Sequence, residues 1–164
     1  MKKLSSENII LNNVEIEKKI ERISLQILED NINEEKIVIF GISDNGVIIA
    51  KKIIEHLNKI SKLQSSLCKV INDNSIKYDQ KFDITDTSIL IIDDVSQSGK
   101  TLQSVISDLF NFNPKRIKTA VIVNRDHSLF PVKIDYSGIS LSTSVNEHVE
   151  FTIDKDAKMT VYLN

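Results

Sequence analysis

The feature that most constrains the fold is a regular alternation of short apolar runs and amphipathic stretches between residues 37 and 123. Apolar side chains recur three and four residues apart in the amphipathic stretches, as on one face of a helix, whereas the apolar runs have the length of buried strands. The sequence predicts helices at about 15–30, 46–57 and 100–110, and strands at 36–40, 67–71, 88–92 and 117–123. This alternation favours an α/β fold with a parallel sheet and helices on both of its faces.

The remaining segments carry weaker patterns. Residues 72–87 are polar and without a period, so we expect a loop, and residues 124–164 indicate irregular segments and short strands, with Met159–Leu163 as an edge strand. A chain of 164 residues that is 41% apolar and 27% charged is typical of one globular domain spanning 1–164.

Nothing in the sequence suggests a membrane or an oxidising compartment. No apolar run approaches the roughly 20 residues that span a bilayer, and no apolar segment follows the basic start as in a secretion signal. Cys68 is the single cysteine, which excludes an internal disulfide, and its place in an apolar strand predicts a small core residue. We therefore expect a cytoplasmic protein that does not bind membranes.

Glycine is used sparingly, at Gly41, Gly46, Gly99 and Gly138 only. The first three lie in two short segments, each between a predicted strand and a predicted helix. Glycine permits close backbone approach and a positive φ, and ligands of open α/β sheets bind beyond the carboxyl ends of the strands. The turns at 41–46 and 93–100 are therefore predicted to be ligand loops.

The second of these turns combines acids with a helix start. Asp93 and Asp94 directly follow the strand Ser88–Ile92, where we expect them to point to opposite sides of the sheet. Carboxylates can clamp vicinal hydroxyls or hold a divalent cation through water. Residues 96–101 then open a helix, whose free N–H groups and dipole suit phosphate. Acids for a diol followed by a phosphate cradle fit a sugar phosphate.

Three other interpretations of this turn remain open from its residues alone. Gly99-Lys100-Thr101 is similar to the end of a nucleotide P-loop, but Asp94 stands where that motif has its first glycine. An aspartate pair at a strand end also occurs in phospho-accepting receiver domains, which have no phosphate cradle directly after the acids. The simplest alternative is an acidic turn followed by an ordinary capped helix.

The run Ile89–Leu102, I-L-I-I-D-D-V-S-Q-S-G-K-T-L, resembles the phosphoribosyl pyrophosphate (PRPP) signature of type I phosphoribosyltransferases. The resemblance implies their α/β fold, a parallel sheet flanked by helices with a small hood from the chain ends. It also implies that Asp93 and Asp94 hold the ribose hydroxyls and Mg²⁺. The residues that would bind the 5-phosphate are Ser96, Gln97, Ser98, Gly99, Lys100 and Thr101.

Two further segments support the resemblance. Gly41–Val47 is similar to the family's pyrophosphate loop, whose amides would come from Ile42, Ser43, Asp44, Asn45 and Gly46. The order of motifs after residue 121, and the run at 83–86, are similar to the PyrR branch, whose members regulate pyrimidine-operon attenuation and are also uracil phosphoribosyltransferases. This implies that Asn124 and Arg125 receive the base, and that the protein is a homodimer.

The chain departs from the family pattern in two places. Asn45 stands where the pyrophosphate loop usually has an arginine, and the stretch 71–81 is short and lacks the Arg-Asp-Asp run of the family's mobile loop. Lys77 and Lys81 are the candidate cations that replace this run. The candidate catalytic residues are therefore Asp94, Lys77 and Lys81. Losing one group that stabilises developing charge can cost about 100- to 1,000-fold in rate, and lysine does not replace arginine at a bidentate phosphate site.

Three hypotheses about function follow. The first is a Mg²⁺-dependent transferase that moves phosphoribosyl from PRPP to a nucleobase, with uracil as the expected base, and releases pyrophosphate. The second is a regulator that binds PRPP or a nucleotide without turnover. The third, compatible with either, is RNA binding in the PyrR manner, in which His127 is a candidate contact. The net charge of -2 does not support it. The basic residues Lys115, Arg116 and Lys118 follow the helix 100–110, and we expect them to solvate a loop and to favour the C-terminus of that helix.

Overall fold

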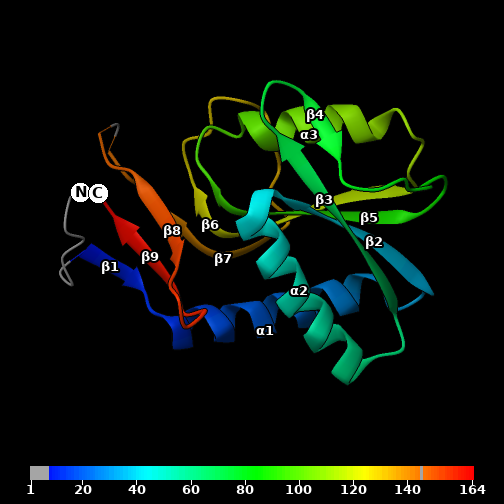
Figure 1. Cartoon of the computed structure of the whole chain (residues 1–164), viewed down its shortest axis with the longest axis horizontal. Helices are drawn as coiled ribbons and strands as arrows, with labels where there is room; N and C mark the ends of the chain where they lie inside the picture. Colours follow the sequence, from blue (N-terminus) through cyan, green and yellow to red (C-terminus); the bar gives the residue numbers. More distant parts are fainter. Residues whose placement is uncertain (1–7, 145) are drawn as a thin grey trace.

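A computed structural model describes residues 8–144 and 146–164, which form two sheets and three helices (Figure 1). The larger sheet contains β2 (Lys36–Ile42), β3 (Gln64–Asn72), β4 (Ile76–Tyr78), β5 (Ser88–Ser96), β6 (Arg116–Arg125) and β7 (Tyr136–Leu141). The smaller sheet contains β1 (Ile9–Leu11), β8 (Val149–Ile153) and β9 (Met159–Leu163). The helices are α1 (Asn13–Asp30), α2 (Ser43–Ile60) and α3 (Lys100–Phe110).

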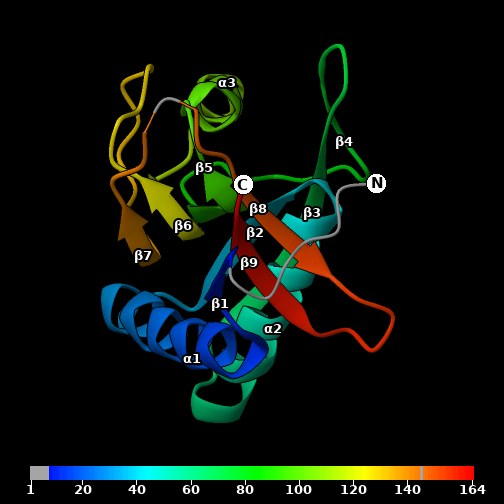
Figure 2. The same cartoon turned by 90° about the vertical axis from the view of Figure 1, so that its left-hand side faces the viewer.

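The larger sheet has the strand order β4-β3-β2-β5-β6-β7. Neighbouring strands from β3 to β7 are parallel, and β4 is antiparallel to β3. Figure 2 shows α1 and α2 together on one face of this sheet and α3 on the other. The predicted parallel sheet with helices on both faces is confirmed.

The apolar stripe of α1 explains why this segment is helical and where it packs. Ile16, Ile20, Ile23 and Ile27 are each at most 1% exposed, so the spacing of three and four places all of them against the sheet. The helix starts with a capping box between Asn12 and Glu15, which pairs two backbone N–H groups at its first turn.

The stretch 72–87, expected to be a loop, contains the short strand β4. Tyr78 and Phe82 pack edge to face with Phe40 of β2, with ring centroids 5.7 and 5.0 Å from it. The Tyr78 hydroxyl also donates a hydrogen bond to Asp108 of α3. Contacts to distant elements thus hold a three-residue strand whose own sequence shows no strand pattern.

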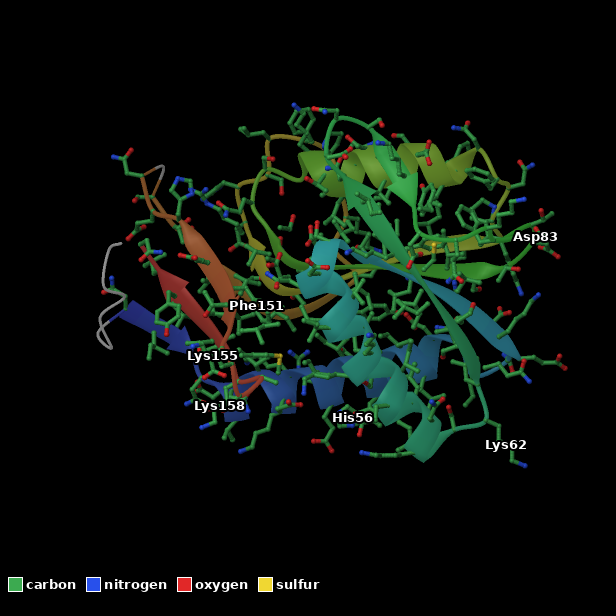
Figure 3. All side chains as sticks on the ribbon, in the orientation of Figure 1. His56, Lys62, Asp83, Phe151, Lys155 and Lys158 are labelled. Carbon is green, nitrogen blue, oxygen red and sulfur yellow. The ribbon has the colours of Figure 1, made fainter. Side chains whose placement is uncertain are left out.

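The smaller sheet, with order β1-β9-β8, forms a hood built from both ends of the chain. Met159–Leu163 was expected at an edge, which is wrong, because β9 pairs antiparallel with β1 on one side and β8 on the other. Met159 and Val161 are fully buried, and Phe151 of β8 faces the same core (Figure 3). The hood itself is confirmed.

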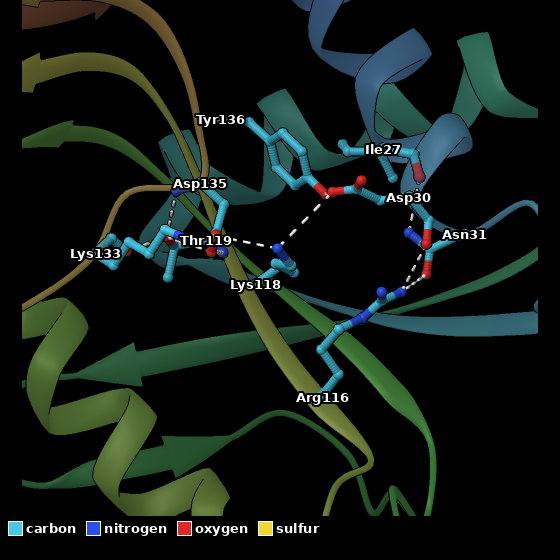
Figure 4. A network of polar contacts seen from close by, with 9 residues as sticks. All are labelled: Ile27, Asp30, Asn31, Arg116, Lys118, Thr119, Lys133, Asp135 and Tyr136. Atoms are coloured by element: carbon cyan, nitrogen blue, oxygen red, sulfur yellow. Dashed lines mark hydrogen bonds and ion pairs between the residues drawn. The ribbon is translucent and has the colours of Figure 1, made fainter.

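A network of polar contacts fastens the end of α1 to β6 and β7 (Figure 4). Arg116 donates hydrogen bonds to the Asp30 carbonyl and to Asn31 Oδ1, at 3.0 and 2.8 Å. Lys118 lies between the carboxylates of Asp30 and Asp135, at 3.9 and 3.3 Å, and the Tyr136 hydroxyl donates to Asp30. Arg116 and Lys118 thus bind the C-terminal end of α1, where cations are favoured, and not the end of the helix 100–110, as expected from the sequence.

No helix in the described residues is both long and apolar enough to cross a bilayer.

Candidate functional site

The predicted ligand residues meet at the carboxyl edge of the larger sheet. In the register of the strands, Gly41 of β2 stands beside Ile92 of β5, and Asp93 stands beside Val121 of β6. β2 ends level with the acid pair, whereas β5 and β6 run on together until Ser96 stands beside Asn124. The start of α2, the acid pair and residues 124–125 therefore lie at the same carboxyl end of the sheet.

A hollow of about 190 Å³ opens at the start of α3. Its lining residues are Asp93, Val95, Ser96, Gln97, Ser98, Gly99, Lys100, Thr101 and Leu102. The Lys100 amide donates to Ser98 Oγ at 3.2 Å, and no side chain caps the helix. The next N–H groups of the first turn of α3, those of Thr101 and Leu102, have no partner within the helix and suit an anion placed in this hollow.

Gly99 sets the shape of the turn that borders the hollow. Its φ of 79° lies in the left-handed region, and a Cβ there would come within 2.9 Å of Val132 Cγ1. The amides of Leu129 and Phe130 donate to the Ser98 carbonyl at 2.9 and 3.0 Å. Gln97 Nε2 donates to the Val149 carbonyl of the hood at 3.2 Å, so two other segments brace this turn.

The two acids face different neighbours. Asp93 lines the hollow, whereas Asp94 Oδ2 accepts a hydrogen bond from Asn45 Nδ2 of α2 at 2.8 Å. Burial raises the pKa of Asp93 well above its ordinary value, and the adjacent charge of Asp94 raises it further. A ligand hydroxyl or a cation placed before the pair would offset this repulsion.

A magnesium site fits these residues only in part. Within the described residues, no group of three or more His, Cys, Asp or Glu side chains gathers at one point. Asp93 and Asp94 offer two adjacent carboxylates, and Mg²⁺ in proteins is commonly held by one or two carboxylates, waters and the oxygens of a bound phosphate. The donor set therefore suits a cation that arrives with a phosphate ligand.

The predicted pyrophosphate loop is the end of β2 and the first turn of α2. The helix begins at Ser43, not at Gly46 as expected, and Ser43 has a φ of 57°. A Cβ on Gly46 would lie 2.6 Å from the Ile92 carbonyl oxygen, so only glycine lets α2 approach β5 this closely. No side chain caps this helix either, and its first N–H groups remain directed at the edge.

The residues predicted to receive the base lie at the end of β6. Asn124 Nδ2 is 3.5 Å from Ser140 Oγ, and Arg125 Nη2 donates to the Ser144 carbonyl at 2.6 Å. Within the described part of the chain, Arg125 Nε, Thr143 Oγ1 and Ser96 Oγ are buried without a partner. Buried polar atoms of this kind mark a place for a ligand or for water.

The candidate cations of the short loop lie outside these contacts. Lys77 of β4 pairs with Asp73 at 3.7 Å. Lys81 lines another hollow with Tyr78, Gln80, Phe82 and Phe112. His127 shares a hydrogen bond of 3.2 Å with Ser142 Oγ.

Sequence reasoning missed one charged residue at the edge. Lys69 of β3 donates to Asp44 Oδ1 in the first turn of α2, at 2.6 Å. In the sequence, Lys69 stands out only as a charged residue inside an apolar strand. The sequence pattern does not indicate its partner Asp44, which lies 25 residues earlier.

Comparisons with known proteins agree with this geometry. The family model described as "Phosphoribosyl transferase domain" matches residues 6–156. The chain is 33% identical over 149 residues to bifunctional protein PyrR of Streptococcus agalactiae, covering 85% of this chain and 86% of that one. It is 31% identical over 170 residues to bifunctional protein PyrR of Clostridium kluyveri, covering 94% and 96%.

Solved structures show the same fold. The hypoxanthine phosphoribosyltransferase of Trypanosoma cruzi superposes with a TM-score of 0.78 at 17% identity, covering 94% of this chain and 95% of that one. A hypoxanthine-guanine phosphoribosyltransferase of Bacillus anthracis gives a TM-score of 0.73 at 19% identity, covering 82% and 81%. With the family match spanning the whole carboxyl edge, the chain belongs to the phosphoribosyltransferase family and is related within it to PyrR.

Proposed function

We propose that this protein binds PRPP with Mg²⁺ and transfers its phosphoribosyl group to a nucleobase, uracil in the first place, with release of pyrophosphate. The observation that carries the proposal is the hollow at the uncapped start of α3 with Asp93 in its wall. A phosphate cradle that adjoins a carboxylate pair matches a ribose that carries a 5-phosphate and two free hydroxyls.

Each part of PRPP has a counterpart along the edge. The amides of Thr101 and Leu102 at the start of α3 receive the 5-phosphate, and Asp93 and Asp94 accept hydrogen bonds from the ribose hydroxyls. The first turn of α2 receives the pyrophosphate, and the Asn45–Asp94 hydrogen bond keeps this turn beside the acids. Mg²⁺, when bound with PRPP, neutralises part of the pyrophosphate charge.

The transfer breaks the bond between ribose C1 and pyrophosphate and forms a bond between C1 and a ring nitrogen of the base. That nitrogen gives up its proton to solvent, so pyrophosphate and a proton are released. The bond to pyrophosphate breaks with oxocarbenium character at C1, so the protein acts mainly by positioning the reactants and stabilising charge on the leaving group. The carboxylates of Asp93 and Asp94 add favourable electrostatics beside the positive ribose ring.

The base is proposed to enter at the end of β6. Arg125 Nε is a donor without a partner, and Thr143 Oγ1 is a hydroxyl without one, within the described residues. Uracil carries two carbonyl acceptors that suit such donors. The relation to PyrR supports uracil over a purine. The solved structures of hypoxanthine phosphoribosyltransferases share only the fold with this chain and do not argue for a purine.

The decisive experiment follows pyrophosphate release from PRPP with Mg²⁺ and each of uracil, cytosine, hypoxanthine and guanine. We expect turnover with uracil, and its loss in Asp94→Asn. Asp83→Asn is the matched control, because Asp83 lies at the far end of the molecule from the hood (Figure 3). Activity in Asp94→Asn equal to the wild-type level would contradict the roles given to the acid pair.

The alternative is a regulator that binds PRPP without turnover. It is favoured by Asn45, which engages Asp94 where relatives usually have an arginine, and by Lys77, which is paired with Asp73. Calorimetry that shows PRPP binding, combined with no pyrophosphate release for any base, would reject the transferase and support this alternative.

A further inference from the structure

Lys69 is placed over the start of α2 by the register of the sheet. It stands on β3 beside Gly41 of β2, and its ammonium donates to Asp44 Oδ1 at 2.6 Å. The lysine side chain is 33% exposed, and the Asp44 side chain is 86% exposed. The ammonium therefore lies at the accessible rim of the helix start and not within the core.

The neighbouring strands order the groups along this edge. β3, β2 and β5 are adjacent and parallel, and adjacent strands lie about 4.8 Å apart. Lys69, the first turn of α2, the acid pair and the hollow of α3 therefore follow one another. A ligand with one phosphate in that hollow and a diol at Asp94 reaches the first turn of α2 with its other end.

The first turn of α2 needs a nearby cation if it is to bind an anion. The uncapped amides of α2 attract an anion, but the Asp44 carboxylate opposes one. Lys69 offsets that carboxylate and lowers the pKa of Asp44 through a hydrogen bond and its positive charge. An ammonium has three donors, so two remain for a ligand. Among the ion pairs of residues 8–144 and 146–164, only this one involves the first turn of α2.

We propose that Lys69 binds the pyrophosphate end of PRPP and supplies the positive charge that the turn 42–46, which lacks an arginine, does not provide. This assignment rests on the proposed function. Asp44 holds the ammonium at the turn in the free protein, and the pyrophosphate competes with Asp44 for it in the complex.

The test compares three ligands by calorimetry in the presence of Mg²⁺: PRPP, inorganic pyrophosphate and ribose 5-phosphate. Lys69→Met keeps the length of the side chain and removes its charge. We expect it to weaken PRPP and pyrophosphate about 10-fold, with ribose 5-phosphate unchanged within about 2-fold, because that ligand occupies only the hollow and the acid pair. Lys69→Arg should retain most of the affinity for PRPP.

Lys52→Met is the matched control. Lys52 is 28% exposed and pairs with Glu17 at 2.5 Å, so its loss also removes a half-buried ion pair, but in the middle of α2. We expect all three affinities to stay at wild-type values. Asp44→Asn should have the opposite effect to Lys69→Met and tighten pyrophosphate, because it releases the ammonium and removes an opposing charge.

The outcomes separate the two proposals. PRPP affinity in Lys69→Met equal to wild type would overturn the role of Lys69 alone. An equal loss for ribose 5-phosphate would also overturn it, since the effect would then come from a disturbed fold. A wild-type protein that binds neither PRPP nor ribose 5-phosphate would overturn the proposed function itself.

Discussion

At the scale of single residues, the surroundings of Asp93 disfavour the charged form of its carboxyl group. Burial and the charge of Asp94 raise its pKa, so the folded protein binds its proton more tightly than the unfolded chain does. Such a group contributes stability below its unfolded pKa, near 3.9, and this contribution is lost as the pH rises through the folded pKa. At neutral pH the carboxylate is therefore destabilising.

Asp93→Asn should raise the melting temperature at pH 7, by about 2–4 °C for each kcal/mol added to the free energy of unfolding. The difference in melting temperature from wild type should shrink as the pH falls toward 4. Thermal unfolding across this pH range measures the effect. Asp83→Asn is the control, because the pKa of exposed Asp83 is lowered by the Thr85 amide and removing its charge gives no such gain. Equal melting temperatures for the two variants at pH 7 would show that the charge of Asp93 does not destabilise the fold.

Individual residues also mark how far the sequence predicts the site. The placing of Asp93 and Asp94 beside the start of a helix could be predicted because this arrangement is local, a strand followed directly by a helix. The pairing of Lys69 with Asp44 could not, because only the register of β3 against β2 brings them together. The bracing of Ser98 by the 129–130 amides likewise depends on contacts between distant segments.

At the scale of elements, the site depends on two helices that start at the ends of adjacent strands. α2 is fixed by the close approach of Gly46 to the Ile92 carbonyl, and α3 starts after the left-handed turn at Gly99. The sequence predicted both helices because each has a clear apolar stripe. It placed the start of α2 three residues late, because Ser43, Asp44 and Asn45 show no apolar period.

Gly46→Ala should push α2 away from β5, because its Cβ would meet the Ile92 carbonyl oxygen at 2.6 Å. We expect the free energy of unfolding to fall by about 1–3 kcal/mol and PRPP binding to weaken with it. Denaturant unfolding and calorimetry measure the two effects. Asn58→Ala, on an exposed position of the same helix, should change stability by at most about 0.5 kcal/mol.

The contact between α1 and β7 gives a second prediction at this scale. Tyr136→Phe removes the hydroxyl that donates to Asp30 (Figure 4) and should lower the free energy of unfolding by about 1–3 kcal/mol. Tyr162→Phe is the comparison, since its hydroxyl has no hydrogen bond among the described residues. If both variants unfold at the same denaturant concentration as wild type, the Tyr136–Asp30 contact contributes nothing to stability.

At the scale of the whole molecule, the proposed function predicts that ligand binding stabilises the fold. A ligand present at 100 times its Kd stabilises by about 2.7 kcal/mol, which for this size corresponds to roughly 5–10 °C in the melting temperature. We expect PRPP to produce this shift with Mg²⁺ and to lose most of it when EDTA is added. A shift that is unaffected by EDTA would argue against a metal in the complex.

The charge of the molecule bears on RNA binding. The net charge is -2, and Lys115, Arg116 and Lys118 are engaged by Glu34, Asn31 and Asp135. The side chains of these three residues are therefore already paired within the protein. An affinity for structured RNA that falls with added salt would place such binding on another face.

The central position of β9 in the hood has a consequence for biosynthesis. β1 is made first and β8 much later, yet among the described residues the two are joined in the sheet only through Met159–Leu163. Until residues 159–163 have been made, β1 and β8 lack the strand that pairs with both, so the hood that Gln97 contacts at Val149 cannot close. A chain truncated before residue 159 would therefore keep every strand of the larger sheet, the last of which ends at Leu141, but would have an open hood.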